Sequence, residues 1–199
     1  YDPEKAKALL AEAGWKDTDG DGILDNTIDG SKVKFEMTYL YNQGNDTRKA
    51  VGLLFQEEAR KVGITVNVIS QDWSIFLETT KQHDFDMYYG AWISTPIPND
   101  HKQIYHTSSY NGGSNYTGFG DDYTDALIDS IRVAIDEEKR AELNFKFQDI
   151  LHDECSYIYL YYPKERIGIH KRFDNASTSA MRPGYRLSGF SVKQPTAAQ

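Results

Sequence analysis

The sequence has one cysteine, no long hydrophobic run and no cluster of basic residues. Because Cys155 is alone, an internal disulfide is excluded, and we expect a buried, unreactive thiol because no basic group adjoins it. No apolar stretch approaches the roughly 18 residues of a membrane span. The net charge of -8 and the pI near 5.1 argue against nucleic acids and anionic membranes, which bind clustered Lys and Arg.

Sequence motifs for several kinds of chemistry are also missing. No glycine-rich phosphate loop follows a predicted strand, and no Gly-x-Ser-x-Gly elbow is present. The histidines lack the spacing of a zinc site and are expected on the surface: His83, His101, His106, His152 and His170. The N-terminus has neither Met nor the basic-then-apolar pattern of a signal peptide, so we expect a piece of a longer chain.

The chain of 199 residues, 39% hydrophobic, can bury the core of one domain or of one large domain with an extension. A helix is predicted to begin after Asp2, a good N-cap, with Pro3 in its first turn. Gly14 can end this helix in the left-handed conformation, after which Trp15 packs back.

An Asp-rich loop follows this helix. Its carboxylates are at positions one, three, five and nine of a calcium loop, with glycine at position six: Asp17, Asp19, Asp21 and Asp25. Position twelve is Ile28, where a bidentate Glu should close the shell. A calcium site and a plain polar turn, which favours the same residues, both remain open.

The next part of the sequence predicts an α/β sheet. Alternating apolar residues predict strands over 33–41, 64–69 and 85–92, and an apolar stripe predicts helices over 46–62 and 74–81 between them. A strand, helix, strand order predicts parallel strands with a right-handed crossover. Two helices are predicted over 123–133 and 136–153, then strands over 156–163 and 166–170. The tail from Lys171 has a short apolar element over 187–192 and ends in polar residues that we expect to be loose or cut off.

Trp92 is the first candidate for ligand binding. Pro96 and Pro98 must end the third strand just after it, and ligands of open α/β sheets bind where strands end. The long irregular stretch over 94–122 is predicted to be functional. An enzyme using Asp84 and Asp86 as paired carboxylates is the alternative of another class.

The order of these motifs resembles the second lobe of the oligopeptide- and dipeptide-binding family, the solute-binding proteins of peptide ABC transporters. The most specific match is Tyr-Asp-Pro-Glu-Lys-Ala-Lys-Ala-Leu-Leu-Ala-Glu-Ala-Gly-Trp at 1–15. The Asp-Gly-Asp-Gly turn, the helix and strand over 53–68, the Asp84-Phe85-Asp86 strand ending in Trp92, and the helix at 125–129 also match. Together these blocks cover nearly the whole chain.

The resemblance implies one lobe, with a mixed sheet flanked by helices, of a two-lobed periplasmic-binding-protein-like fold that closes on its ligand. The ligand-binding residues would be Trp92, Ser94, Thr95, Asp100 and Tyr185. Peptide binders of the family carry an Asp three residues after the tryptophan to pair with the ligand's ammonium. Thr95 stands at that position here, so either Asp100 takes this role or the ligand lacks a free amino end.

The same resemblance implies a non-enzymatic receptor for an oligopeptide, dipeptide or similar small polar ligand. Its partners would be the missing N-terminal lobe and an ABC permease, without nucleic acid. The protein would be a monomer in the periplasm or elsewhere outside the cytoplasm, with or without a lipid anchor. No cofactor would be required, and Ca²⁺ at the Asp17–Asp25 loop stays an open candidate. An oligosaccharide or nickel-chelate receptor and a calcium-dependent interaction module remain alternatives.

Overall fold

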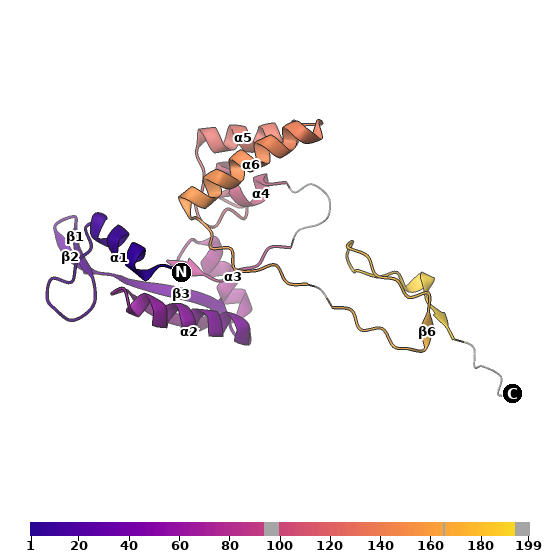
Figure 1. Cartoon of the computed structure of the whole chain (residues 1–199), viewed down its shortest axis with the longest axis horizontal. Coiled ribbons are helices and arrows are strands. Elements are labelled where there is room, and N and C mark those ends of the chain that lie inside the picture. The colour runs from indigo at the N-terminus through magenta and orange to yellow at the C-terminus, as the bar shows by residue number, and fades with distance from the viewer. Residues whose placement is uncertain (94–99, 165, 194–199) are drawn as a thin grey trace. The chain divides into compact units, whose positions relative to one another are not determined.

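The computed structural model describes residues 1–93, 100–164 and 166–193 (Figure 1). The chain divides into two compact units, residues 1–91 and 92–199. Within the described ranges, no helix combines the length and the hydrophobicity that crossing a membrane requires.

The first unit is built on a small parallel sheet. Its strands are β3 (Glu36–Asn42), β4 (Thr65–Gln71) and β5 (Met87–Tyr88), in the order β4-β3-β5. Helices α2 (Asp46–Arg60) and α3 (Trp73–Lys81) connect them, while α1 (Pro3–Glu12) and an antiparallel hairpin of β1 (Asp25–Ile28) and β2 (Ser31–Lys34) precede them. The predicted α/β architecture and the parallel strands are confirmed.

Local residue choices explain where these helices begin and end. The Asp2 carboxylate accepts the backbone N–H of Lys5 at 2.9 Å, and the Asn45 side chain accepts that of Arg48 at 3.0 Å. After α2, Gly63 has φ +84, and a Cβ there would lie 2.7 Å from Leu24 Cγ. Glycine is therefore required at this turn for both its conformation and its size.

The core of the first unit lies around the central strand. Three consecutive residues of β3, Tyr39, Leu40 and Tyr41, are buried, so both faces of this strand are covered. Helix α2 packs closely against it: a Cβ on Gly52 would lie 2.4 Å from Cε1 of Tyr39. The Tyr39 hydroxyl also donates to the carbonyl of Arg48 at 2.9 Å. This close packing fixes α2 against the sheet.

Two predicted strands have different limits in the structure. The strand predicted over 33–41 is two strands, because residues 31–34 pair with β1 while the N–H of Phe35 donates to Leu24 O and its carbonyl accepts from Thr65. The strand predicted over 85–92 is β5 alone, with one further bond from the Tyr89 N–H to Leu40 O. Arg48 Nη1 donates to the Tyr89 carbonyl at 3.1 Å, so this acceptor is used outside the ladder.

The second unit has a helical core. It contains the short helices α4 (Lys102–Tyr105) and η1 (Thr107–Ser109) and the long helices α5 (Asp122–Val133) and α6 (Glu137–Glu154). Asp121 forms a capping box with Thr124, and Asp136 caps α6 by accepting the Lys139 N–H at 2.7 Å. The buried apolar side chains are Tyr105, Phe119, Leu127, Ile128, Ile131, Phe147 and Leu151. Both predicted long helices are confirmed.

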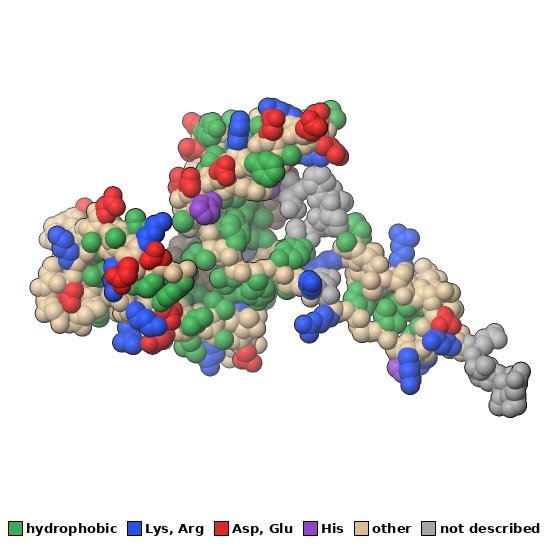
Figure 2. All heavy atoms as spheres, in the orientation of Figure 1, with side chains coloured by type: hydrophobic (Ala, Val, Ile, Leu, Met, Phe, Trp, Pro, Cys, Tyr) green, Lys and Arg blue, Asp and Glu red, His purple; other side chains and the backbone are tan. Residues whose placement is uncertain are grey.

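After α6 the structure corrects the prediction. Residues 156–163 and the described residues 166–170 form no strand, because among the described residues no strand pairs with them and a strand needs a neighbour for its N–H and C=O groups. Residues 156–162, named here the aromatic segment, expose their hydrophobic side chains from Ile158 to Tyr162 by 51–79% (Figure 2).

The tail from Lys171 contains a small antiparallel sheet. Strands β6 (Phe173–Asp174) and β7 (Ser191–Val192) pair antiparallel, and η2 (Leu187–Gly189) lies between them in the chain. The rings of Phe173 and Phe190 pack with centroids 5.7 Å apart. The apolar element predicted over 187–192 coincides with η2 and β7, whereas strands of two residues each are too short to show a period in the sequence.

Two side chains lie in environments opposite to the predicted ones. Cys155 is exposed, since it caps α6 in the left-handed conformation (φ +50), and its thiol donates to the carbonyl of His152 at 3.2 Å. His106 is buried instead of lying on the surface. It follows α4 directly, and its Nδ1 accepts the backbone N–H of Ser108 at 3.1 Å, which turns the ring into the unit.

Candidate functional site

Trp92, the first candidate from the sequence, is 41% exposed and begins the second unit. Its indole stacks on the ring of Tyr116, with centroids 6.1 Å apart and planes 23° from parallel. Tyr116 was not predicted as a site residue. Its signal was present in the sequence, since it is an aromatic residue within the glycine-rich stretch 111–120, but a position 24 residues from Trp92 gives no indication of contact.

The loop that carries Tyr116 is held by its neighbour in the chain. Asn115 is completely buried, and its Nδ2 donates to the carbonyls of Phe119 at 2.8 Å, His106 at 3.2 Å and Tyr105 at 3.4 Å. Its backbone N–H donates to Ser109 O at 3.2 Å. A hollow of about 360 Å³ lies beside it, lined by Thr107, Tyr110, Asn111, Asn115, Gly118 and Phe119. One amide therefore fixes both sides of an otherwise irregular loop.

Asp100, the candidate partner of a ligand ammonium, already forms an ion pair. Its Oδ1 lies 3.1 Å from Nε of Arg132 and accepts the backbone N–H of Lys102 at 3.0 Å. The Asp129 carboxylate also contacts Arg132, at 3.6 Å from its Nη1, and lies 3.5 Å from Nζ of Lys102. Partial burial opposes ionisation of Asp129, but Lys102, His106 and Arg132 together hold its pKa below the usual value.

The remaining predicted ligand residues are separated from this group or not described. Ser94 and Thr95 lie outside the described residues. Tyr185 belongs to the C-terminal segment, where its ring packs against Phe190 with centroids 6.4 Å apart and its backbone bridges to Thr178. In the part of the chain that the structure describes, Trp92 and Tyr185 therefore occupy separate clusters.

The carboxyl end of the parallel sheet has a polar cluster that the sequence reasoning missed. Arg48 Nη1 donates to Oδ1 of Asn42 at 2.8 Å and to the Tyr89 carbonyl at 3.1 Å, and its guanidinium lies 5.2 Å from the centre of the Tyr89 ring. Asn42 and Gln71 end adjacent strands, and Gln71 Oε1 is buried without a hydrogen-bond partner among the described atoms. The sequence signal for this cluster was the presence of the polar residues Asn42 and Gln71 at the ends of two predicted strands, where ligands of α/β sheets bind.

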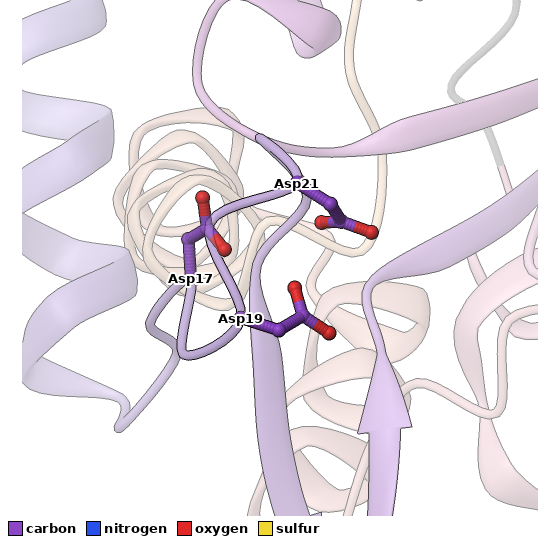
Figure 3. A group of neighbouring side chains, drawn as sticks. All are labelled: Asp17, Asp19 and Asp21. Atoms are coloured by element: carbon purple, nitrogen blue, oxygen red, sulfur yellow. The ribbon is translucent and has the colours of Figure 1, made fainter.

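The Asp-rich loop brings three of its four predicted ligands together. Carboxylate oxygens of Asp17, Asp19 and Asp21 lie within 4.8 Å of one another, with Asp19 and Asp21 projecting to the same side of the loop (Figure 3). Asp17 accepts the backbone N–H groups of Gly20 at 2.7 Å and Gly22 at 2.9 Å. All three side chains are exposed.

Two lysines of β2 compensate the charge of this loop. Lys32 lies 3.0 Å from Asp19 and 3.2 Å from Asp25, and Lys34 pairs with Asp21. Hydrogen bonds from these lysines are the main cause of the lowered pKa values of Asp19 and Asp21. The two lysine ammonium groups thus occupy positions beside the carboxylates that a bound Ca²⁺ would otherwise neutralise.

Asp25, the fourth predicted ligand, is buried and has a different set of partners. Its carboxylate accepts the N–H of Thr18 at 3.0 Å and the Thr18 hydroxyl at 2.8 Å. Burial opposes ionisation of Asp25, but the bonds from Thr18 and Lys32 outweigh it and lower the pKa. Asp25 therefore ties the loop to the hairpin.

The carboxylates of the enzyme alternative lie at the amino end of β5. Asp84 and Asp86 line an open depression of about 340 Å³ with Thr38, His83 and Phe85. The Asp86 carboxylate accepts the backbone N–H of Thr38 at 2.8 Å, which gives it a structural role in joining the start of β5 to β3. Ligands of parallel sheets bind at the carboxyl end, so this depression is at the less favourable end.

Comparison with known proteins gives a consistent picture. Residues 1–115 match the family model described as bacterial extracellular solute-binding proteins, family 5 middle. The chain is 34% identical over 190 residues to the oligopeptide-binding protein AppA of Bacillus subtilis, which covers 94% of this chain and 34% of AppA. The structure of AppA in complex with a nonapeptide superposes with a TM-score of 0.84 at 30% identity, covering 96% of this chain and 37% of that one.

A second solved structure has a different ligand. A periplasmic oligopeptide-binding protein of Thermotoga maritima, crystallised with mannohexaose, superposes with a TM-score of 0.71 at 25% identity, covering 82% of this chain and 31% of that one. The chain thus spans about a third of the length of the relatives that it matches.

Proposed function

The chain belongs to the bacterial extracellular solute-binding proteins of family 5, and on this premise we propose that it is part of a receptor that captures a peptide for an ABC transporter. The observation that most directly supports this proposal is the structural similarity, over 96% of the chain, to a protein crystallised with a nonapeptide. The half-exposed Trp92 supplies an apolar surface for such a ligand. Binding would be non-covalent, and no catalytic role is assigned to any residue.

The rest of the full-length protein is the first partner in this proposal. The aromatic segment exposes several adjoining hydrophobic side chains, which is unusual for a surface that stays in contact with water. Since about two thirds of each compared relative lies outside the matched region, we propose that an N-terminal lobe covers this segment and forms the other wall of the ligand site. The complete receptor would be a monomer outside the cytoplasm, periplasmic or lipid-anchored, that delivers its ligand to a permease.

The ligand's amino end would bind at a carboxylate that already forms an ion pair. Asp100 is the nearest acid downstream of Trp92 in the sequence, and an ammonium binding there would compete with Arg132. A sugar would need no such carboxylate, and the Thermotoga relative binds mannohexaose. The ion pair of Asp100 therefore makes a comparison between free and blocked amino ends informative.

We predict that the full-length protein binds peptides and that it co-purifies with them. Native mass spectrometry of the purified protein should release peptide masses, and calorimetry should give Kd values for a series of synthetic peptides. Blocking the amino end by acetylation should weaken binding about tenfold or more, because the neutral amide can no longer form a charge-assisted hydrogen bond with the carboxylate. Asp100→Asn should remove this difference if Asp100 is the partner. Binding of mannohexaose without binding of any peptide would replace the proposed ligand class.

The calcium site remains a prediction, and we expect weak binding. Two lysines already pair with carboxylates of the loop and position twelve is Ile28, so a Kd on the order of 1 mM is expected, as in weak extracellular sites. At 10 mM Ca²⁺ such a site would stabilise the fold by ~1.4 kcal/mol, raising the melting temperature by a few degrees. Thermal unfolding with Ca²⁺ and with Mg²⁺ measures this.

Asp19→Asn is the matched control for calcium. The Asp19 carboxylate accepts from Lys32 through one oxygen, and the amide oxygen of asparagine can keep this bond while one ligand charge is lost. The variant should fold normally and show no Ca²⁺ shift. An equal shift in the variant, or none in the original chain, rejects the site.

A further inference from the structure

We infer that Tyr116 is a second aromatic contact of the ligand site and that Asn115 is the positioning residue that holds it beside Trp92. The two rings would together bind an aromatic or large apolar side chain of the peptide. This inference rests on the proposed function and specifies which part of the peptide the site selects.

The rings of Trp92 and Tyr116 are stacked on each other. Their centroids are 6.1 Å apart and their planes differ by 23°, an offset-stacked arrangement that aromatic pairs favour. Such a pair presents adjoining ring faces and edges as one surface. Trp92 remains 41% exposed and Tyr116 is partly exposed, so this surface is accessible from outside the unit.

The loop that carries Tyr116 is preorganised by hydrogen bonds of Asn115. Asn115 ties together the carbonyls of three residues on both sides of the loop, Tyr105, His106 and Phe119. Close packing adds to this constraint, since a Cβ on Gly113 would lie 2.5 Å from the Ser109 carbonyl oxygen. A loop that is already fixed loses little conformational entropy on binding, so its side chains contribute more of their contact energy to affinity.

The chemistry of the Trp92–Tyr116 surface determines which ligand side chain it would bind. Two stacked rings offer dispersion and apolar contact over a flat area, with the phenol hydroxyl at one edge. Asp100, the first acid downstream of Trp92, is already paired with Arg132. The surface therefore favours a flat or bulky apolar side chain over a small or anionic one.

The test compares two peptides that differ only by Phe or Ala at one position. In the full-length protein, the position at which Phe binds more tightly is first identified by scanning. Tyr116→Ala should then weaken the Phe peptide about tenfold while weakening the Ala peptide much less. Tyr116→Phe, which keeps the ring, should retain the original preference. A change confined to this ratio cannot arise from general destabilisation.

Asn115→Asp tests the positioning role. Its carboxylate cannot donate to the three carbonyls, so the stack should loosen, and the near-UV circular dichroism of the Trp92–Tyr116 pair should fall together with the Phe preference. The positioning role is overturned if Tyr116→Ala loses the Phe preference while Asn115→Asp retains both the Phe preference and the near-UV circular dichroism.

The outcomes separate this inference from the proposed function. If Trp92→Ala weakens peptide binding but Tyr116→Ala leaves the Phe-to-Ala ratio unchanged, the role of Tyr116 is rejected and the peptide receptor stands. If the full-length protein binds no peptide in the series, both are rejected. If Tyr116→Ala weakens the two peptides equally, Tyr116 supports the loop and does not select a side chain, which also rejects the inference.

Discussion

Replacing Trp92 by alanine should weaken peptide binding by the full-length protein about 10- to 100-fold. The indole is 41% exposed in this chain, and a ligand that covers it removes the remaining apolar surface from water. Aromatic side chains can bury ~150–250 Å², so covering the exposed 41% of this residue at ~25 cal/mol per Å² contributes ~1.5–2.5 kcal/mol, which falls within this range of affinity. Isothermal titration calorimetry of the original protein and the variant measures the change.

The matched control for Trp92 is Phe145→Ala. Phe145 is also an aromatic residue of the second unit, and it is 64% exposed on α6. Its removal should leave the peptide Kd within about twofold, since it is not part of the proposed site. Equal Kd values for Trp92→Ala and the original protein would exclude Trp92 from the site.

Replacing Phe147 by alanine should lower the free energy of unfolding of the second unit by ~3–5 kcal/mol, as measured for deeply buried aromatics. Phe147 is 1% exposed, and its ring contacts those of Tyr105, Phe119 and His101, with centroids 5.4, 6.1 and 4.9 Å away. Alanine would leave a cavity bounded by rigid rings that cannot collapse into it. Urea denaturation followed by circular dichroism measures the loss.

Phe145→Ala serves again as the control, because it makes the same chemical change two residues away on the same helix. Phe145 is mostly in solvent, so its replacement should change the free energy of unfolding by less than about 0.5 kcal/mol. Similar losses for both variants would show that α6 does not pack through Phe147, contrary to the structure.

Much of the fold is determined by local sequence. Asp2, Asn45, Asp121 and Asp136 each hydrogen-bond a backbone N–H at the start of a helix, and the apolar spacing of α5 and α6 matches their buried faces. These interactions span three or four residues, so the sequence displays them directly. The parallel order of β3 and β4 follows from the helix that joins them.

Candidate residues were predicted less completely than the fold. The alternation before Trp92 correctly indicated an accessible aromatic close after a strand, because strand period and proline positions are local properties. Tyr116 and Arg48 were missed, since each acquires its role from contacts with residues far along the chain: Trp92 for the first, and Tyr89 for the second.

The sequence by itself determined the helices, their caps, the α/β order and the candidate Trp92, since each depends on neighbours within a few residues. Tertiary structure decided the break at Phe35, the burial of His106 and the pairing of Lys32 and Lys34 with the Asp-rich loop. It also decided that 156–163 forms no strand here, although its composition favours one. A strand is completed by hydrogen bonds to another segment, and a charge is compensated by whichever group folds beside it, so neither outcome is written in local sequence.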